Sequence, residues 1–479
     1  MRSISSLARV FVGRACALVL AAPLVMAGVA PVSVATAGHA MAPAVDSESQ
    51  FDSFNDLKPG DPVPPFGCLH STPIGCFGAD TLRTAYALPA LDGKHDGTGR
   101  TIVVIDAFRN PTIESDLAIF DGFWNLPTPS FEELNPFEAT VDLKDPKQMG
   151  WSVEISIDVE WAHAVAPGAK IVLLLAKSES DVDLLDATTY AIHHNLGDVI
   201  TQSFGEAESC AAPGVLGKQR GVFKLASERG ITIVASSGDK GAGRQSCDGK
   251  SLILSASTPA SDPNVTAVGG TRLLADGNIN KIPGAYLSES VWNSPVLNPD
   301  GTCNLQRSGA SGGGFSTVFR RPAYQAAVND NKEARGVPDV AYNADGATAF
   351  LAVWNGLPLK AHGTSAGAPQ WAGIAALADQ AAGHRLGALN PRLYRIAQSN
   401  AYGSAFHDIT TGNNTFCGIA GYSAGPGWDP VTGLGSPQVA TLVGLLAQDG
   451  EGEHDEQQGG ESGGGNGGNG GTAGDAGGD

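Results

Sequence analysis

Ser365 stands at the start of an apolar segment with helical spacing, in the run HGTSAGAPQWAGIAALADQ. Small residues surround it, so a polypeptide backbone could come close to the hydroxyl, which would lie in the positive field of a helix N-terminus. Such a serine can act as a nucleophile if a base lies within hydrogen-bond reach. The same pattern also fits an ordinary helix N-cap, because serine is a common capping residue.

Glu154 and Asp158 are four residues apart in GWSVEISIDVEWAHAVAPGAK, a segment with helical periodicity. This spacing places both carboxylates on one helix face, one turn apart. Repulsion between them should keep a proton on one carboxyl to a higher pH than usual, and the coupled pair can serve as a base and its partner. The alternative is a solvated acidic face, but no basic residue shares that face and large apolar neighbours predict partial burial.

Asp239 follows a buried apolar run in ITIVASSGDKGA and lies in a glycine-flanked turn. An aspartate in such a turn often serves only the turn itself. If its carboxyl faced the nucleophile and kept its proton, it could donate a hydrogen bond to a developing oxyanion. Chemistry of that kind would require acid pH.

His163 has to be considered because imidazole is the usual base for a serine nucleophile. On a continuous helix it lies nine residues from Glu154, which is about half a revolution at ~100° per residue. We therefore predict a core histidine outside the site. A subtilisin-type set of Asp106, His163 and Ser365 is the alternative, and it would predict a neutral or alkaline optimum.

Short runs rich in Val and Ile alternate with segments of helical periodicity. Runs that are apolar on both faces indicate parallel strands, and they occur at 101–106, 170–176, from 198 and from 231. Helical spacing occurs between them at 180–196 and at 215–230, where Gly230 suits the helix end. This order predicts an α/β fold with a doubly wound, mostly parallel sheet and helices on both faces. In that architecture the loops at the carboxyl ends of the strands build the site.

Together these segments resemble the sedolisin family of serine-carboxyl peptidases, whose fold is subtilisin-like. The resemblance runs from FGADTLRTAYAL at 77 to GLGSPQ near 438. It implies that Ser365 is the nucleophile that becomes acylated, Glu154 the general base, Asp158 its partner and Asp239 the oxyanion donor.

The resemblance extends to residues around this set. It implies that the segment Ser203 to Gly205 pairs with substrate backbone and that Asp106 is a further carboxylate behind the acid pair. SGGGFS from Ser311 and VPDVAYNAD from Val337 also resemble family segments that line or support the cleft.

FHDITTG and GYSAGPGWDPVTGLGSP resemble the calcium site of the same family. The resemblance implies carboxylate oxygens from Asp408 and Asp429, and backbone carbonyl oxygens from Ile409, Gly425 and Gly427. Calcium favours six or more oxygens of this mixed kind, with water completing the shell. We expect a structural Ca²⁺ ion; an ordinary loop rich in Gly and Asp is the alternative.

The first 37 residues have the features of a signal peptide. Arg2, Arg9 and Arg14 precede or flank an apolar run, and small residues lead to Ala37. The run is interrupted by Pro23 and is shorter than the ~20 residues of a membrane-spanning helix. We therefore expect cleavage near Ala37 and export.

The rest of the chain divides by composition. Residues 38–78 indicate a short N-terminal extension, 79–448 the sedolisin-like peptidase domain, and 449–479 a disordered, acidic, Gly-rich tail. Family members usually carry a long pro-domain, whereas about forty residues separate the predicted signal from the core here. Zymogen control by such a domain is therefore not expected.

Cysteine usage and charge restrict the compartment and the partners. Loss of Cys16 with the signal leaves six of the seven cysteines, an even number that predicts disulfides in an exported protein, with Cys68 and Cys76 as one pair. A net charge of −19 argues against nucleic acid and anionic membranes as partners. We expect a secreted, monomeric peptidase that acts on polypeptides in acid. A non-catalytic secreted binding protein on the same fold is a further alternative.

Overall fold

The structure is a computed structural model that describes residues 42–43, 74–89, 94–277, 284–329 and 332–448. The predicted signal peptide, the predicted tail, Cys68 and most of the predicted extension lie outside the described residues, and those predictions stay untested.

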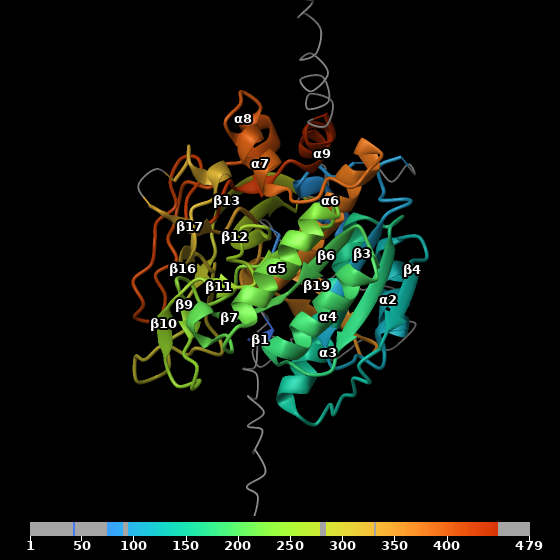
Figure 1. The fold of residues 1–479 in the computed structure, drawn as a ribbon, viewed down its shortest axis with the longest axis horizontal. Coiled ribbons are helices and arrows are strands. Elements are labelled where there is room, and N and C mark those ends of the chain that lie inside the picture. Colours follow the sequence, from blue (N-terminus) through green and yellow to red (C-terminus); the bar gives the residue numbers. More distant parts are fainter. Residues whose placement is uncertain (1–41, 44–73, 90–93, 278–283, 330–331, 449–479) are drawn as a thin grey trace, which may run out of the picture. The chain divides into compact units, whose positions relative to one another are not determined.

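The described chain is built around a mixed sheet of eight strands (Figure 1). Seven of them follow the order β13-β12-β8-β6-β3-β5-β4, and the eighth, β18, also pairs with β12. Its neighbouring strands are parallel except for β12 and β13, which are antiparallel. The strands are β3 (Thr101–Ala107), β4 (Ser130–Leu134), β5 (Lys170–Ala176), β6 (Val199–Gln202), β8 (Thr232–Ser236), β12 (Thr266–Asp276), β13 (Ala285–Val291) and β18 (Val340–Asn343).

Helices cover both faces of this sheet, because alternate side chains of each buried strand point to opposite faces. Ile102 and Val104 of β3 pack in one core with α2 (Ile113–Trp124), α3 (Pro146–Val165) and α6 (Thr364–Ala382). Val103 and Ile105 pack in a second core with α4 (Asp181–His193) and α5 (Val215–Glu228). The predicted doubly wound, mostly parallel α/β fold is confirmed.

The other elements lie around this framework. The remaining helices are α1 (Ala79–Ala85), α7 (Asn390–Ala397), α8 (Tyr402–Ala405) and α9 (Val439–Gln448), with short 3-10 turns at Glu208–Cys210, Ala323–Gln325 and Gly346–Thr348. Small sheets pair β2 (Cys76–Phe77) and β20 (Leu357–Ala361) with β19 (Ala349–Trp354), β9 (Gly243–Gln245) with β10 (Leu252–Leu254), β14 (Asn293–Ser294) with β15 (Gly309–Ala310), β16 (Gly314–Arg320) with β17 (Ala334–Val337), and β21 (Phe406–His407) with β22 (Ser436–Pro437).

A three-stranded antiparallel sheet lies directly after β6. Its middle strand β7 (Phe204–Ala207) has β11 (Ser257–Thr258) on one edge and β1 (Ala42–Pro43) on the other. Thus two residues from the predicted N-terminal extension pair in extended form with the segment that follows Ser203.

Two disulfides join Cys210 to Cys247 and Cys303 to Cys417. Cys76 is also disulfide-bonded, whereas Cys68, its predicted partner, is outside the described residues. Among the helices that the structure describes, none is long and apolar enough to cross a membrane.

Candidate active site

Helix α3 carries the predicted acid pair through the protein core. Asp145 caps it, because its side chain accepts a hydrogen bond from the Lys147 backbone N–H at 2.9 Å, and Pro146 occupies the first turn, where no N–H is needed. Every residue from Gly150 to Val165 is buried. The helix is therefore held on all sides, and its polar side chains lie where a low dielectric strengthens their interactions.

Glu154 and Asp158 are both completely buried, beyond the partial burial that the sequence predicted. The Ser203 hydroxyl donates to Asp158 Oδ1 at 2.8 Å, while neither buried oxygen of Glu154 has a hydrogen bond of standard geometry in the described part of the chain. Burial, and then the neighbouring Asp158 carboxyl, raise the pKa of Glu154 well above its usual value; burial also raises the pKa of Asp158. One proton is thus held in the pair over a wide pH range, as the spacing predicted.

Ser365 lies in the first turn of α6, beside Glu154. The helix cap is Gly363, whose φ of +125° favours glycine, and no side chain caps this end; the alternative that Ser365 is an N-cap is therefore wrong. Among the described residues the buried hydroxyl has no hydrogen bond of standard geometry, but it is close enough to Glu154 to lower the pKa of that carboxyl. In a site without substrate, the hydrogen bond between a nucleophile and its base is often long, and it shortens when substrate binds.

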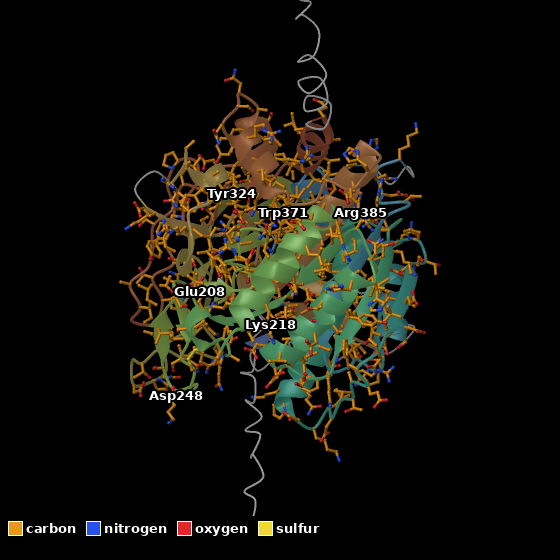
Figure 2. The ribbon with its side chains drawn as sticks, viewed as in Figure 1. Glu208, Lys218, Asp248, Tyr324, Trp371 and Arg385 are labelled. Carbon is orange, nitrogen blue, oxygen red and sulfur yellow. A yellow bond between two sulfur atoms is a disulfide. The ribbon has the colours of Figure 1, made fainter. Side chains whose placement is uncertain are left out.

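The packing of α6 fixes the position of this hydroxyl. Trp371, two turns further along, is fully buried and its indole N–H donates to the carbonyl oxygen of Ala341 at 3.1 Å (Figure 2). Because Ala341 belongs to β18, the helix is tied to the central sheet, and Ser365 cannot shift along the helix axis without breaking that contact.

Asp239 is held against the nucleophile helix by Thr364. The backbone N–H and the hydroxyl of Thr364 donate to Asp239 Oδ1 at 2.9 and 2.8 Å, and the Gly238 N–H donates to that hydroxyl at 2.9 Å. Burial raises the pKa of Asp239 to about 7, although Thr364, Lys240 and Arg244 act in the opposite direction. A carboxyl that keeps its proton in acid and lies beside Ser365 can donate to an oxyanion.

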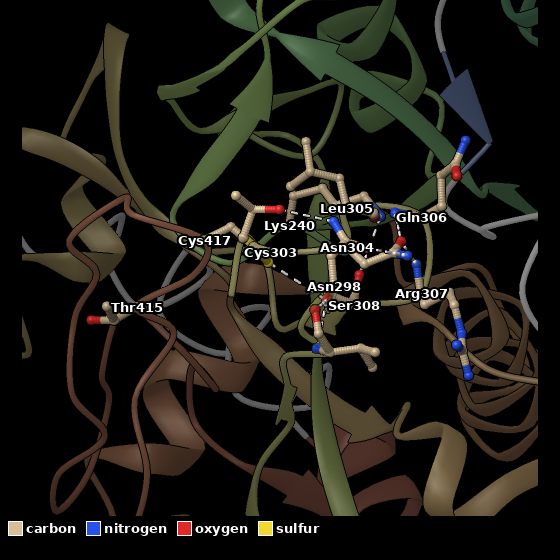
Figure 3. The surroundings of a disulfide bond; sticks show 12 residues. Lys240, Asn298, Cys303, Asn304, Leu305, Gln306, Arg307, Ser308, Thr415 and Cys417 are labelled. Atoms are coloured by element: carbon tan, nitrogen blue, oxygen red, sulfur yellow. Dashed lines mark hydrogen bonds between the residues drawn. A yellow bond between two sulfur atoms is a disulfide. The ribbon is translucent and has the colours of Figure 1, made fainter. Parts of the chain in front are cut away.

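The turn that carries Asp239 is further anchored by Lys240. Its ammonium group donates to the carbonyl oxygens of Leu305 at 2.7 Å and Ser308 at 3.3 Å, in the loop that the Cys303–Cys417 disulfide closes (Figure 3). The disulfide therefore fixes the loop on which the Asp239 turn rests.

Asp106 is the next-to-last residue of β3 and lies behind the acid pair. It is fully buried, and neither carboxyl oxygen has a hydrogen bond within the described residues. Burial, and then Asp158, raise its pKa well above the usual value, while Asp106 in turn raises that of Glu154. A third carboxyl is thus electrostatically connected to the pair.

His163 is buried on α3 but faces α2. Its Nε2 donates to the carbonyl oxygen of Pro127 at 3.0 Å and lies 3.3 Å from Asp121 Oδ1. The helix geometry predicted this position on the side away from the acid pair. His163 therefore cannot serve as the base in a set of Asp106, His163 and Ser365.

The predicted substrate strand lies beside the nucleophile. The Ser203 hydroxyl is 3.3 Å from the Ser365 carbonyl oxygen, and Gly205 pairs with Ala42 of β1. A Cβ at Gly205 would lie 2.2 Å from Ser257 Oγ, so only glycine lets β7 pack this closely against β11. The edge of β7 that faces β1 accepts an extended antiparallel chain.

The predicted calcium ligands lie in one loop region. Asp408 Oδ2 accepts from the Gly427 N–H at 3.0 Å, and Asp429 Oδ2 from the Gly425 N–H at 3.2 Å. Both carboxylates lie near Tyr402, whose pKa is raised by burial and then by Asp408. In the described part of the chain, no hydrogen bond ends on the carbonyl oxygens of Ile409, Gly425 or Gly427.

That region could hold Ca²⁺ only with a mixture of carboxylate and backbone carbonyl oxygens as ligands. Among the described residues, no three Cys, His, Asp or Glu side chains converge as a metal-binding group. Two carboxylates with several free carbonyl oxygens nevertheless match the preference of Ca²⁺ for oxygen ligands.

Thr364 and Glu206 were missed from the sequence. Thr364 adjoins the nucleophile in the GTS motif, and its hydroxyl is a signal that could have been followed; its link to Asp239 spans 125 residues along the chain. Glu206 follows Gly205 directly, but nothing in its local sequence indicates that it lies buried beside a second carboxylate.

Known proteins are similar to this chain in sequence and in fold. Residues 152–396 match the model of the subtilase family. Kumamolisin from Bacillus sp. (strain MN-32) is 36% identical over 362 residues, which cover 73% of this chain and 60% of that protein. Sedolisin from Pseudomonas sp. (strain 101) is 34% identical over 346 residues, covering 70% and 56%. Tripeptidyl-peptidase 1 from Mus musculus is 32% identical over 398 residues, covering 76% and 63%.

A solved structure agrees with these sequence matches. Pseudomonas sedolisin, a serine-carboxyl proteinase complexed with two molecules of pseudo-iodotyrostatin, matches with a TM-score of 0.69 and 28% identity over 79% of this chain and 100% of that chain. The fold and the matched segment define a member of the subtilase family. Within it, the chain belongs to the sedolisin family. The chain spans about 60% of the length of the curated relatives it matches.

Proposed function

We propose that this chain is a serine-carboxyl peptidase that hydrolyses peptide bonds of polypeptides through an acyl-enzyme on Ser365. One observation carries the proposal: Ser365, the Glu154–Asp158 pair and Asp239 meet in one buried site, next to a strand edge that accepts an extended chain. Relatives named as a serine-carboxyl proteinase and as a tripeptidyl-peptidase support it.

In the first half of the reaction, Glu154 takes the proton of the Ser365 hydroxyl as Oγ attacks the carbonyl carbon of the bound peptide. Asp158, which accepts a hydrogen bond from Ser203, shares a proton with Glu154. Because the charge is distributed over the pair, a change of protonation there costs less free energy. The oxyanion accepts a hydrogen bond from the protonated Asp239 carboxyl. Glu154 then returns the proton to the leaving amine, and the acyl group stays on Ser365.

In the second half, water replaces the amine. Glu154 takes a proton from that water as the water attacks the ester carbonyl, and Asp239 again stabilises the oxyanion. Collapse releases the carboxylic acid product, and the proton returns from Glu154 to Ser365 Oγ. A non-catalytic binding protein would have no need for these groups to converge around a serine.

Replacement of Asp239 by asparagine should change the alkaline limit of activity. Because the pKa of Asp239 is about 7, the wild-type carboxyl donates below that pH and ionises above it, so kcat/KM should fall as pH rises through 7. The amide of Asp239→Asn donates at every pH, and the fall should weaken or disappear. The measurement is kcat/KM for a fluorogenic peptide from pH 3 to 9. An alkaline limb that is identical in both proteins would contradict the assigned role.

Peptide digestion tests the overall function. Wild type and Ser365→Ala are incubated with a denatured protein across pH 3 to 8, and the products are identified by mass spectrometry. We expect cleavage in acid by wild type alone. Fragments of mixed length would establish endopeptidase action, whereas serial loss of three residues would establish tripeptidyl-peptidase action. No cleavage at any pH would refute the proposal.

We also propose a structural Ca²⁺ ion held by Asp408, Asp429 and the carbonyl oxygens of Ile409, Gly425 and Gly427. Burial raises the pKa of Asp429 to about 6, and a cation there would favour the charged form. Because the ion would bind only the folded chain, EDTA should lower the Tm by about 5 °C, and Ca²⁺ but not Mg²⁺ should restore it. Asp408→Asn should abolish this response. A Tm that is insensitive to EDTA would contradict the site.

The proposal extends to the compartment. Disulfides Cys210–Cys247 and Cys303–Cys417 support export to an oxidising environment, in agreement with the signal-like N-terminus. We propose a secreted monomer in which residues 79–448 form the peptidase domain and the proton that Asp239 must keep sets an acid working range.

A further inference from the structure

The edge of β7 that would hold a substrate in place of β1 also presents a carboxylate without a function in the mechanism above. Glu206 follows Gly205, whose backbone pairs with Ala42 of β1. It differs from Glu208, two residues further on (Figure 2), whose carboxylate accepts hydrogen bonds from the Thr317 N–H at 2.8 Å and the Thr317 hydroxyl at 3.0 Å. Glu208 thus has a structural role, whereas Glu206 lacks such contacts.

Glu206 is 8% exposed, and its buried Oε1 has no hydrogen bond to any residue that the structure describes. Asp181, the first residue of α4, is fully buried nearby. Its Oδ2 accepts from the Ala212 N–H at 2.7 Å, but its Oδ1 has no hydrogen bond to a described residue. Within the described residues, neither carboxylate forms an ion pair. Burial, and then Asp181, raise the pKa of Glu206 to about 8. Without a counter-charge, Glu206 keeps its proton up to about pH 8, and a cation bound beside it would favour the charged carboxylate.

The register of β1 shows which residue of a bound chain would meet Glu206. An antiparallel chain on this edge places one residue opposite Gly205 and the preceding residue opposite Glu206. Ser203 contacts both Ser365 and Asp158, so the residue opposite Ser203 is the one whose carbonyl faces the nucleophile. Counting back along the chain, the residue opposite Glu206 is the fourth on the amino side of the cleaved bond.

The surroundings of Glu206 also suit a long cationic side chain. Side chains directly opposite each other in an antiparallel pair lie on the same face of the sheet. Phe204 shares that face with Glu206, and its ring packs against Trp151 with the centroids 6.0 Å apart. The aliphatic stem of lysine or arginine can pack along apolar surface while its charged end reaches the carboxylates.

We propose that Glu206, with Asp181 behind it, forms a subsite that binds a lysine or arginine side chain at the fourth residue on the amino side of the cleaved bond. The inference rests on the proposed function, because it takes the polypeptide on β7 to be the substrate. Glu206 is then a specificity-determining residue.

Binding to the Ser365→Ala protein tests the subsite without requiring catalysis, and it is measured at pH 8.5 because the pKa of Glu206 is about 8. Two peptides are compared that differ only at the fourth residue, lysine or glutamate; both are N-acetylated, so a free α-amino group cannot supply the charge. We expect the lysine peptide to bind about tenfold more tightly. Adding Glu206→Gln should reduce this ratio to about threefold or less, and Glu206→Lys should invert it. Glu228→Gln, at an exposed glutamate of α5, is the matched control and should keep the ratio.

Equal binding of the two peptides, or a ratio that Glu206→Gln leaves unchanged, would overturn the subsite. Thermal unfolding of each variant checks that it is folded. Turnover of the same peptides by the wild type separates the two claims. Cleavage without charge preference refutes the subsite alone. Preferential binding of the lysine peptide, with no cleavage of either peptide in acetylated form or with a free amino terminus, refutes the peptidase function and leaves the cationic subsite in place.

Discussion

Replacement of Ser365 by alanine is expected to lower kcat/KM for peptide hydrolysis by about 10⁴-fold or more. Its hydroxyl is the only group in the proposed site that forms a covalent bond to the substrate, and the remaining oxyanion donor cannot replace it. Because this buried hydroxyl has no hydrogen bond of standard geometry among the described residues, its loss should leave the Tm nearly unchanged. Initial rates on a fluorogenic peptide at acid pH, together with a thermal melt, measure both effects.

The control for this change is Ser115→Ala, on the exposed side of α2, where the hydroxyl only contacts the carbonyl oxygen of Thr112. That protein should keep wild-type activity. If Ser365→Ala retained more than a small fraction of the rate, another group would have to be the nucleophile.

Substitution of Glu154 by glutamine should reduce kcat by about 10²- to 10⁴-fold, because the variant cannot take the serine proton. The amide has the size of the protonated carboxyl, so the fold should be preserved. The change in the free energy of unfolding also has a predictable sign. The folded-state pKa of Glu154 is raised, so the glutamate contributes stability in acid that is lost as pH rises through the folded pKa. The variant should therefore be at least as stable as wild type at neutral pH.

Glu160→Gln is a matched control for that result. Glu160 is buried on the same helix, but its Oε2 accepts from the Val353 N–H at 2.9 Å and takes no part in the site. An amide oxygen can accept the same hydrogen bond. Glu160→Gln should therefore stay active. If both substitutions lowered kcat equally, the loss of a buried carboxyl in general, and not the loss of a base at Glu154, would explain the effect.

The sequence predicted the central fold because its signals are local. The strands β3 and β5 are apolar on both faces, and α4 and α5 lie in the segments with helical spacing. The two-residue strands β1 and β11 could not be predicted in this way, since a pair of residues carries no periodicity. The pairing of Cys303 with Cys417 was equally out of reach, because it depends on how segments 114 residues apart meet.

The same distinction applies to the site. Helical spacing alone placed Glu154 and Asp158 on one face and His163 on the other, and both predictions are confirmed. Full burial of the pair was not predicted, because it comes from the packing of α3 against α6 and the sheet. The contact of Asp239 with Thr364 was not predicted, because it joins a turn and the start of α6, which are 125 residues apart in the chain.

The most direct test of acid-assisted attack by Ser365 is to trap the acyl-enzyme. The protein is mixed with a slowly hydrolysed peptide ester at pH 4, quenched in strong acid within seconds, digested and analysed by mass spectrometry. We expect an added acyl mass on the fragment that contains Ser365 in the wild type, and far slower formation of this adduct in Glu154→Gln. Ester turnover with an adduct at another residue, or equally fast acylation in Glu154→Gln, would contradict it.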